Sequence, residues 1–356
     1  MRTWFLTILF LQSLLCAQVD TKFIDPNNCK SCHEEQTQDW DNTWHSRSHE
    51  EKNSLYKEVI TYVQKMTHKT HADVAIGCAK CHNPRLKAPK IDPSYMYAKA
   101  FGLESEATKK VDEAFSADDV LNGISCYVCH NIETIHPKKN QKDAGFDIMT
   151  WTKGDVVVGP YPSNNRAVYH ESEQRDFFLD SDKLCLACHE GNANIHNVPG
   201  YETGTEILLS KLDVKCVECH MSTTKKSIIA PHIASKDEVA IVRNLRDHTF
   251  AGGRNSDILE TSLSVYVQHS SSRVEIGIQN LTPHSVPTGF SGRSLVVEVR
   301  FFDSANKLID SPVYTHLRSL YLDNMGNEAL SYVATKLEED TRLAPLEART
   351  IYISNA

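Results

Sequence analysis

The pattern Cys-x-x-Cys-His occurs five times in this chain of 356 residues. Two thiols at this spacing can add to the two vinyl groups on one edge of a porphyrin, and the adjacent His can then ligate the iron. A zinc site or a dithiol redox site would need the Cys pair, but it would not explain a His after every pair. The motifs therefore predict five covalently attached c-type haems (haem c, with iron). Numbered first to fifth along the chain, they are Cys29, Cys32 and His33; Cys78, Cys81 and His82; Cys126, Cys129 and His130; Cys185, Cys188 and His189; and Cys216, Cys219 and His220.

The eleventh cysteine, Cys16, lies in an N-terminal segment typical of a signal peptide. A short positive n-region precedes an apolar stretch from Trp4 to Leu15, and a cleavage site follows before Gln18. The apolar stretch is shorter than the roughly 18 residues that a spanning helix needs, and no later stretch qualifies. We therefore expect residues 1–17 to be a signal peptide and the mature protein to be periplasmic or extracellular, without a membrane span.

Two regions of different character follow this leader. Residues 18–255 hold all five motifs among helix-like segments, such as 52–69, and turn-rich stretches. Residues 256–356 hold no Cys, and apolar residues alternate with polar ones at 263–267 and 274–278, which is typical of strands. We expect an α+β chain: a haem-packed, mainly helical and loop-rich multihaem cytochrome domain, followed by an antiparallel β-sandwich-like domain.

The charge of the chain bears on its partners. The formal net charge is -8, and haem propionates would make it more negative, so nucleic acid is not an expected partner. We expect a redox protein as electron donor and another as acceptor. The last strand-like run, 349–354, closes the sequence, which leaves open two explanations: the sequence is truncated and lacks a sandwich edge, or another molecule in an oligomer or filament supplies that edge.

Further patterns resemble the multihaem c-type cytochromes related to the tetrahaem cytochrome that takes electrons from hydroxylamine oxidoreductase, and more closely their longer relatives with a C-terminal β-domain. The resemblance runs from Cys29 to about Thr341. The matching positions are Trp40, Thr43 and His45 after the first motif; His136, six residues past His130; Gly159 and Pro160, then His170; His248, Phe250 and Gly252 after the fifth motif; and His284, Pro287, Thr288 and Gly289 in the β-domain.

This resemblance implies a second axial ligand for each iron. The implied distal ligands are His45, His136, His170, His248 and His284, and they equal the motifs in number. If His284 reaches an iron, the β-domain is fixed to the haem domain. The histidines kept in reserve are His49, His71, His196 and His232.

An iron with two imidazole ligands can pass an electron but has no position for a substrate. The first expectation is therefore an exported pentahaem cytochrome that relays electrons between redox partners and is not an enzyme. A reductase or dehydrogenase of nitrogen or sulfur compounds with one open haem is the second, because relatives include such enzymes. A subunit of an extracellular cytochrome filament is the third.

Overall fold

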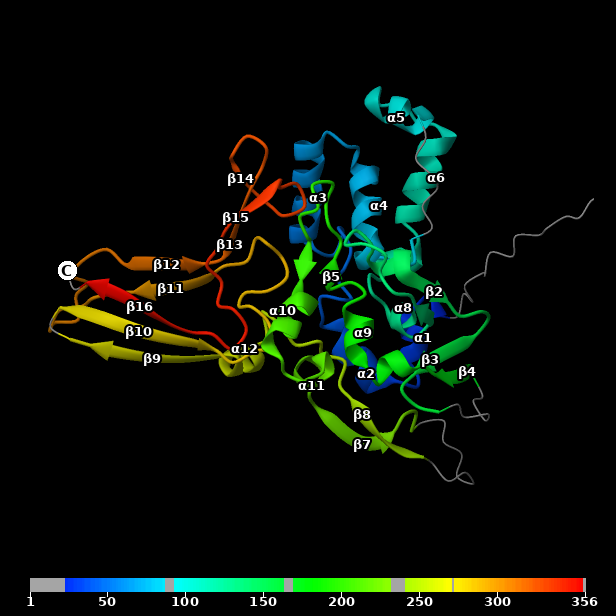
Figure 1. Cartoon of the computed structure of the whole chain (residues 1–356). Helices are drawn as coiled ribbons and strands as arrows, with labels where there is room; N and C mark the ends of the chain where they lie inside the picture. Colours follow the sequence, from blue (N-terminus) through cyan, green and yellow to red (C-terminus); the bar gives the residue numbers. More distant parts are fainter. Residues whose placement is uncertain (1–22, 87–92, 163–168, 232–240, 271, 355–356) are drawn as a thin grey trace, which may run out of the picture.

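The computed structural model describes the chain except for residues 1–22, 87–92, 163–168, 232–240, 271 and 355–356 (Figure 1). The expected signal peptide, with Cys16, and the reserve ligand His232 lie outside the described residues. Helices and strands are both present, as expected for an α+β chain. Within the described part of the chain, every helix is too short or too polar to cross a membrane.

Short helices form most of the motif-bearing part. They are α1 (Pro26–Lys30), α2 (Glu34–Asp41), α3 (Ser54–Thr67), α4 (His71–His82), α5 (Pro93–Ala100), α6 (Glu106–Phe115), α7 (Asp118–Leu121), α8 (Cys126–Cys129), α9 (Ser181–Cys185), α10 (Thr203–Ser210), α11 (Cys216–His220) and α12 (Ser256–Ser262), with the 3-10 turns η2 (Gly145–Ile148) and η3 (Asp176–Phe178). Small strand pairs lie between them: β1 (Ile132–Ile135) with β2 (Met149–Trp151), β3 (Val156–Gly159) with β4 (Glu171–Gln174), β5 (Glu190–Gly191) with β6 (Tyr201–Glu202), and β7 (Thr224–Ile228) with β8 (Val242–Arg246).

Helices α3 and α4 are the longest in this part, and they pack side by side (Figure 1). The Asn53 side chain caps the start of α3, and a capping box of Thr70 and Asp73 starts α4. Their contact buries Tyr56, Ile60, Val74 and Ala75. This cluster is small, and the motifs predict that haem would complete the interior of this part.

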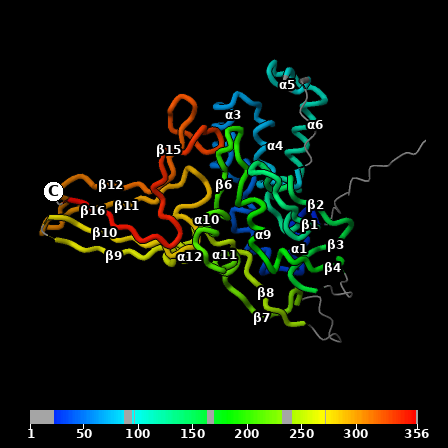
Figure 2. The backbone as a smooth tube through the Cα atoms, viewed as in Figure 1, coloured from blue at the N-terminus to red at the C-terminus, as the bar shows by residue number. Residues whose placement is uncertain are grey.

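The C-terminal strands build two facing layers. Strand β10 (Arg273–Asn280) lies between β9 (Leu263–His269) and β16 (Ala348–Ser354), and β11 (Leu295–Val299) pairs with β12 (Val313–Leu317), all antiparallel. The core between these layers holds Val274, Ile276, Ile278, Leu317, Leu343 and Ile353. A third sheet of β14 (Glu328–Ala329), β13 (Ser319–Leu322) and β15 (Lys336–Asp340) lies nearer the helices. Figures 1 and 2 show β9 to β12 and β16 extending away from the motif-bearing part.

A polar contact centred on Glu206 of α10 joins the two parts. One carboxylate oxygen accepts hydrogen bonds from the Ser285 backbone N–H and from the Thr288 hydroxyl, at 3.1 and 2.6 Å. The other pairs with Arg342 at 2.6 Å, and the Glu206 and Arg342 side chains are only 7% and 12% exposed. This contact fixes the loop that carries His284.

Candidate haem centres

Each of the five motifs forms a tight helical turn. The backbone N–H groups of His33, His130 and His189 donate to the carbonyl of the first Cys of their own motif, at 2.8, 3.0 and 3.0 Å. The second and fifth motifs end helices α4 and α11. One turn of helix brings residues three and four apart to the same face, so both thiols and the His of each motif can meet one porphyrin.

The motif histidines are oriented by their Nδ1 atoms. Nδ1 of His33, His130 and His220 lies 3.3, 2.6 and 2.5 Å from the carbonyl oxygens of Ile229, Val158 and Ala251. A carbonyl only accepts, so Nδ1 of these rings carries the proton and Nε2 keeps a free lone pair for iron. Nδ1 of His82 lies 2.8 Å from the hydroxyl oxygen of Ser48.

Four motif histidines face a second histidine from a distant part of the sequence. The ring-centre distances are 6.4 Å for His33 with His170, and 6.3 Å each for His130 with His248, His189 with His45, and His220 with His284. With metal–nitrogen bonds of about 2.0 Å, two imidazoles on opposite sides of one metal have ring centres about 6.3 Å apart. The four pairs therefore have the spacing of two axial ligands on a single iron.

These rings border internal space. Burial is the main cause that lowers the pKa of His45 to about 3 and the pKa of His130 and His189 to about 4. The same three side chains nevertheless keep accessible surface, His189 the most. Protein surrounds these rings without covering them completely, as a flat porphyrin between two facing rings would require.

Backbone packing positions His45. Its carbonyl accepts the Ile124 N–H at 2.9 Å, and the Ile124 carbonyl accepts the indole N–H of Trp40 at 2.7 Å. Gly123 lies against this turn with φ +60°, and a Cβ there would stand 2.6 Å from the His45 carbonyl oxygen. Only glycine fits this position without strain.

The second motif is different. Its His82 stacks on Tyr56 with ring centres 4.3 Å apart, and among the described residues no second histidine ring lies opposite it. The hydroxyls of Tyr201 and Tyr332 are 2.9 Å apart, and the Cys78 and Cys81 thiols act electrostatically on both phenols. Arg293 lies beside Tyr201. This cluster was missed by sequence reasoning, because its members come from strand β6 and two separate loops and no motif joins them.

His136, expected as a distal ligand, is not brought to a motif histidine. It is exposed just past the end of β1, where its backbone N–H donates to the Ile148 carbonyl at 2.7 Å. The pairing of β1 with β2 buries Ile132 and Ile135, and the His136 side chain lies outside this buried cluster.

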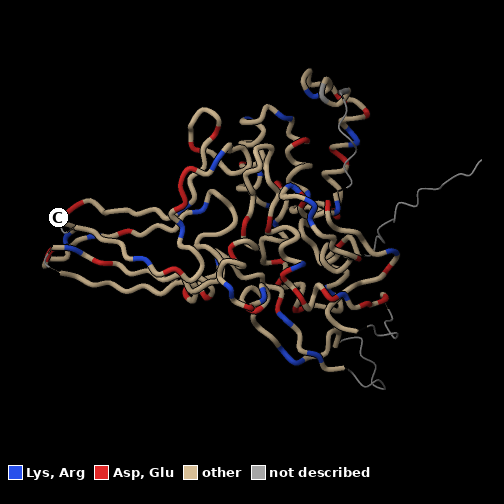
Figure 3. The backbone as a smooth tube through the Cα atoms, viewed as in Figure 1, with Lys and Arg blue, Asp and Glu red and all other residues tan. Residues whose placement is uncertain are grey.

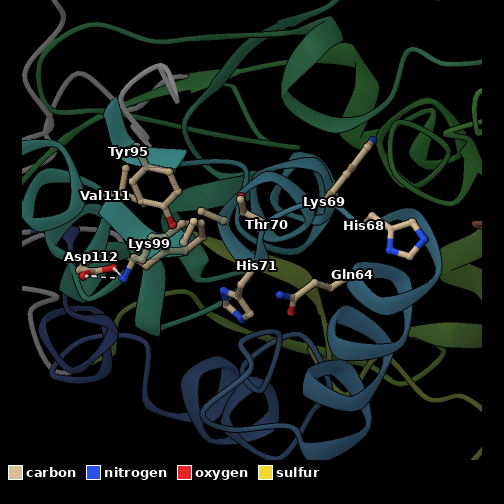
Figure 4. Close-up of a pocket in the computed structure, with 12 residues that line it drawn as sticks. Gln64, His68, Lys69, Thr70, His71, Tyr95, Lys99, Val111 and Asp112 are labelled. Carbon is tan, nitrogen blue, oxygen red and sulfur yellow. Dashed lines mark hydrogen bonds and ion pairs between the residues drawn. The ribbon is translucent and has the colours of Figure 1, made fainter. Parts of the chain in front are cut away.

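The described reserve histidines are engaged elsewhere. His49 is buried and its Nδ1 accepts the Glu51 N–H, His71 pairs with Glu50 at 2.8 Å, and His196 is exposed. His71 also lines a pocket between the α3–α4 turn and α5–α6, together with Gln64, Tyr95 and the ion pair of Lys99 with Asp112 (Figure 4). No residue of a Cys-x-x-Cys-His motif lines this pocket.

The thiols show which motifs are neighbours. A hydrogen bond with the Cys126 thiol lowers the pKa of Cys29, and a hydrogen bond with the Cys216 thiol lowers the pKa of Cys185. A hydrogen bond also joins the Cys81 and Cys188 side chains. Burial raises the pKa of Cys129, and the negative charge of the nearby Cys185 thiolate raises it further. The first motif therefore adjoins the third, the third adjoins the fourth, and the fourth adjoins both the second and the fifth.

Acid should destabilise this arrangement. The folded pKa values of about 3 and 4 lie below the unfolded value of about 6.5, so the unfolded chain binds more protons between these values. The stability contributed by neutral imidazoles is full above about pH 6.5 and is lost as the pH falls toward about 4; iron ligation acts in the same direction. Thermal unfolding followed by the Soret band at pH 7.5 and 4.5 should give the lower melting temperature at pH 4.5. Equal melting temperatures would contradict this.

Comparison with known proteins agrees with these features. Residues 28–131, which include the first three motifs, match the family model described as cytochrome c554 and c-prime. Among solved structures, a penta-haem cytochrome c552 from Thermochromatium tepidum has a similar fold, with a TM-score of 0.65 and 19% identity over 92% of this chain and 86% of that chain. No curated protein sequence matches the chain. The resemblance to the multihaem c-type cytochromes, predicted from the sequence, is thereby confirmed.

Proposed function

We propose that this chain is an exported electron-transfer protein that holds five c-type haems, one on each motif, and passes electrons between a redox donor and a redox acceptor. The observation that carries the proposal is the set of four histidine pairs at 6.3 to 6.4 Å. Bound haem supplies one-electron chemistry, and a second imidazole excludes any other ligand from the iron. The protein's role is to hold the haems, to orient them and to insulate them.

The neighbour relations of the thiols support a relay. They connect the first, third, fourth and fifth motifs in series, with the second as a branch from the fourth. The order in space therefore differs from the order in sequence. Electrons could enter near the first or the fifth motif and reach every other one through neighbours.

The second motif favours a further candidate function, the binding and reduction of a small nitrogen or sulfur compound. His82 has no opposing histidine in the described chain, whereas the hydroxyl pair of Tyr201 and Tyr332 lies near its two cysteines. Hydroxyl and guanidinium groups beside an open ligand position can donate hydrogen bonds to a bound oxygen or nitrogen atom.

A filament subunit would need a histidine from a neighbouring chain as the second ligand of one haem, and the second motif is again the one that could accept it. The other four motif histidines have partners within the chain.

We also propose the organisation expected from the sequence: a leader at 1–17, a haem domain at 18–255, and a sandwich-like module at 256–356 that supplies His284.

The purified protein, oxidised, tests these proposals through its haem-to-protein ratio, its EPR spectrum and titration with cyanide. Five haems, four low-spin and one high-spin, with one cyanide bound per chain, are expected. Five low-spin haems that bind no cyanide would remove the reductase candidate and leave the relay. Fewer than five haems would contradict the proposal of one haem on each motif, and two or more high-spin haems would contradict the four-pair assignment.

A further inference from the structure

Strand β9 forms an open edge of the sheet β16-β10-β9. Its register with β10 places Val265 opposite Ile278 and Val267 opposite Ile276, so both valines lie on the face that contains the core. Ile276 and Ile278 are 5% and 4% exposed, but Val265 and Val267 are 57% and 64% exposed. The opposite layer, β11 with β12, therefore does not reach across β9.

The backbone of β9 is also open along this edge. The Ser270 N–H donates to the Arg273 carbonyl at one end of the β9–β10 pair, and the Leu281 N–H donates to the Ser262 carbonyl at the other end. Hydrogen-bonded positions alternate along an antiparallel strand, so the even-numbered residues of β9 are the ones that bond to β10. The N–H and C=O groups of Leu263, Val265, Val267 and His269 point to the free side. Among the described strands, none pairs with that side.

The sequence of β9 does nothing to prevent pairing. Edge strands are usually protected by charges, proline or a bulge. Strand β15, at the edge of another sheet, carries Lys336, Glu338, Glu339 and Asp340, whereas Leu263–His269 carries no charge and no proline (Figure 3).

We propose that β9 pairs antiparallel with β9 of a second copy of this chain, about a two-fold axis at Tyr266. This register places each outward-pointing odd-numbered residue opposite another one, so every free N–H and C=O of the strand gains a partner. On the core face, Val265 of each copy lies opposite Val267 of the other copy. On the outer face, Ser264 of each copy lies opposite Gln268 of the other copy. Moving the centre to a point between two residues would break the hydrogen-bond pattern, and moving it by one whole residue would leave part of the seven-residue strand without a partner.

Charges at the two ends of β9 agree with a second copy as the occupant. Helix α12, with exposed Asp257 and Glu260, precedes the strand, and Arg273 follows it. An antiparallel two-fold pairing brings the acidic start of each β9 toward Arg273 of the other copy, which also pairs with Glu275 of its own chain. The pairing joins the two three-stranded sheets into one continuous sheet.

Sedimentation velocity of the haem-loaded protein tests this proposal. Wild type should be a dimer, and Val267→Lys should weaken dimerisation at least ten-fold, because it places a cation on the apolar face. Val296→Lys is the matched control, since Val296 is 45% exposed on β11, away from β9, and it should leave the dimer intact. A monomeric wild type, or a dimer unaffected by Val267→Lys, would overturn the proposal.

A cross-link tests the register without relying on stability. Tyr266 meets itself across the axis, at a Cα separation of about 4.5 Å for a non-hydrogen-bonded pair, which a disulfide can span. Tyr266→Cys should form a disulfide-linked dimer on a non-reducing gel. Gln268→Cys, on the same exposed strand but far from its own copy, should not. A cross-link through Cys at 268 and not at 266 would refute the register.

Discussion

Replacing His284 with alanine is expected to convert one haem from low-spin to high-spin. The His284 ring lies 6.3 Å from the His220 ring, and its Nδ1 lies 3.1 Å from the Ser285 carbonyl, so Nε2 is available to an iron held by His220. Without this imidazole the iron keeps one protein ligand, which leaves its other side open. The EPR spectrum should gain one high-spin signal per chain, and the variant should bind one more cyanide than wild type.

His136→Ala is the matched control. This histidine was also implied as a distal ligand, but it is exposed and faces no motif histidine among the described residues. Its removal should leave the EPR spectrum and the cyanide stoichiometry unchanged. If His136→Ala raised the high-spin content and His284→Ala did not, the pairing argued from the ring distances would be wrong for both residues.

The contrast between these two histidines shows what a sequence can and cannot predict here. The motifs are local, because a Cys-x-x-Cys-His turn brings its own groups together, so they can be found without a structure. A distal ligand is non-local: His45 follows the first motif yet faces the fourth, and His170 lies between the third and fourth yet faces the first. These partners depend on the tertiary fold.

The β-strands were predictable in the same local sense. Alternation at 263–267 and 274–278 corresponds to β9 and β10, and the run at 349–354 corresponds to β16. The alternation gave no sign that β9 lies at an edge, where Val265 and Val267 remain exposed on the core face. Whether a strand is covered depends on how far the opposite sheet layer extends, and the alternation of residues along the strand does not show this.

The junction was also hidden from sequence reasoning, although His284 pointed to it. Glu206 looks like an ordinary helix residue, and only the fold brings it to Arg342, Ser285 and Thr288. The loop of His284 is further shaped by fully buried Asn280, whose amide donates to the His284 and Ala344 carbonyls, both at 2.8 Å. The position of His284 therefore depends on buried polar contacts with both parts of the chain.

Glu206→Ala should consequently lower the free energy of unfolding by about 1 to 3 kcal/mol, because the Ser285 N–H and the Thr288 hydroxyl lose their acceptor, while Arg342 keeps its ion pair with Asp340. Thermal unfolding of the haem-loaded protein measures this loss as a fall in melting temperature of roughly 2 to 10 °C. Glu328→Ala breaks the exposed pair with Arg318 and should cost at most about 1 kcal/mol.

A double variant distinguishes weaker pairing of Arg342 from loss of the hydrogen bonds to the His284 loop. Replacing Glu206 and Arg342 together with methionine removes both charges and keeps the volume, so the stability lost in Glu206→Ala through weaker pairing of Arg342 should return, less the cost of leaving Asp340 without its partner. Ser285 and Thr288 still lose their acceptor in the double variant, so the recovery should be incomplete. If the double variant is no more stable than Glu206→Ala, the weaker pairing of Arg342 is not the cause of the loss. The hydrogen bonds to the His284 loop would then be the main contribution of Glu206 to the junction.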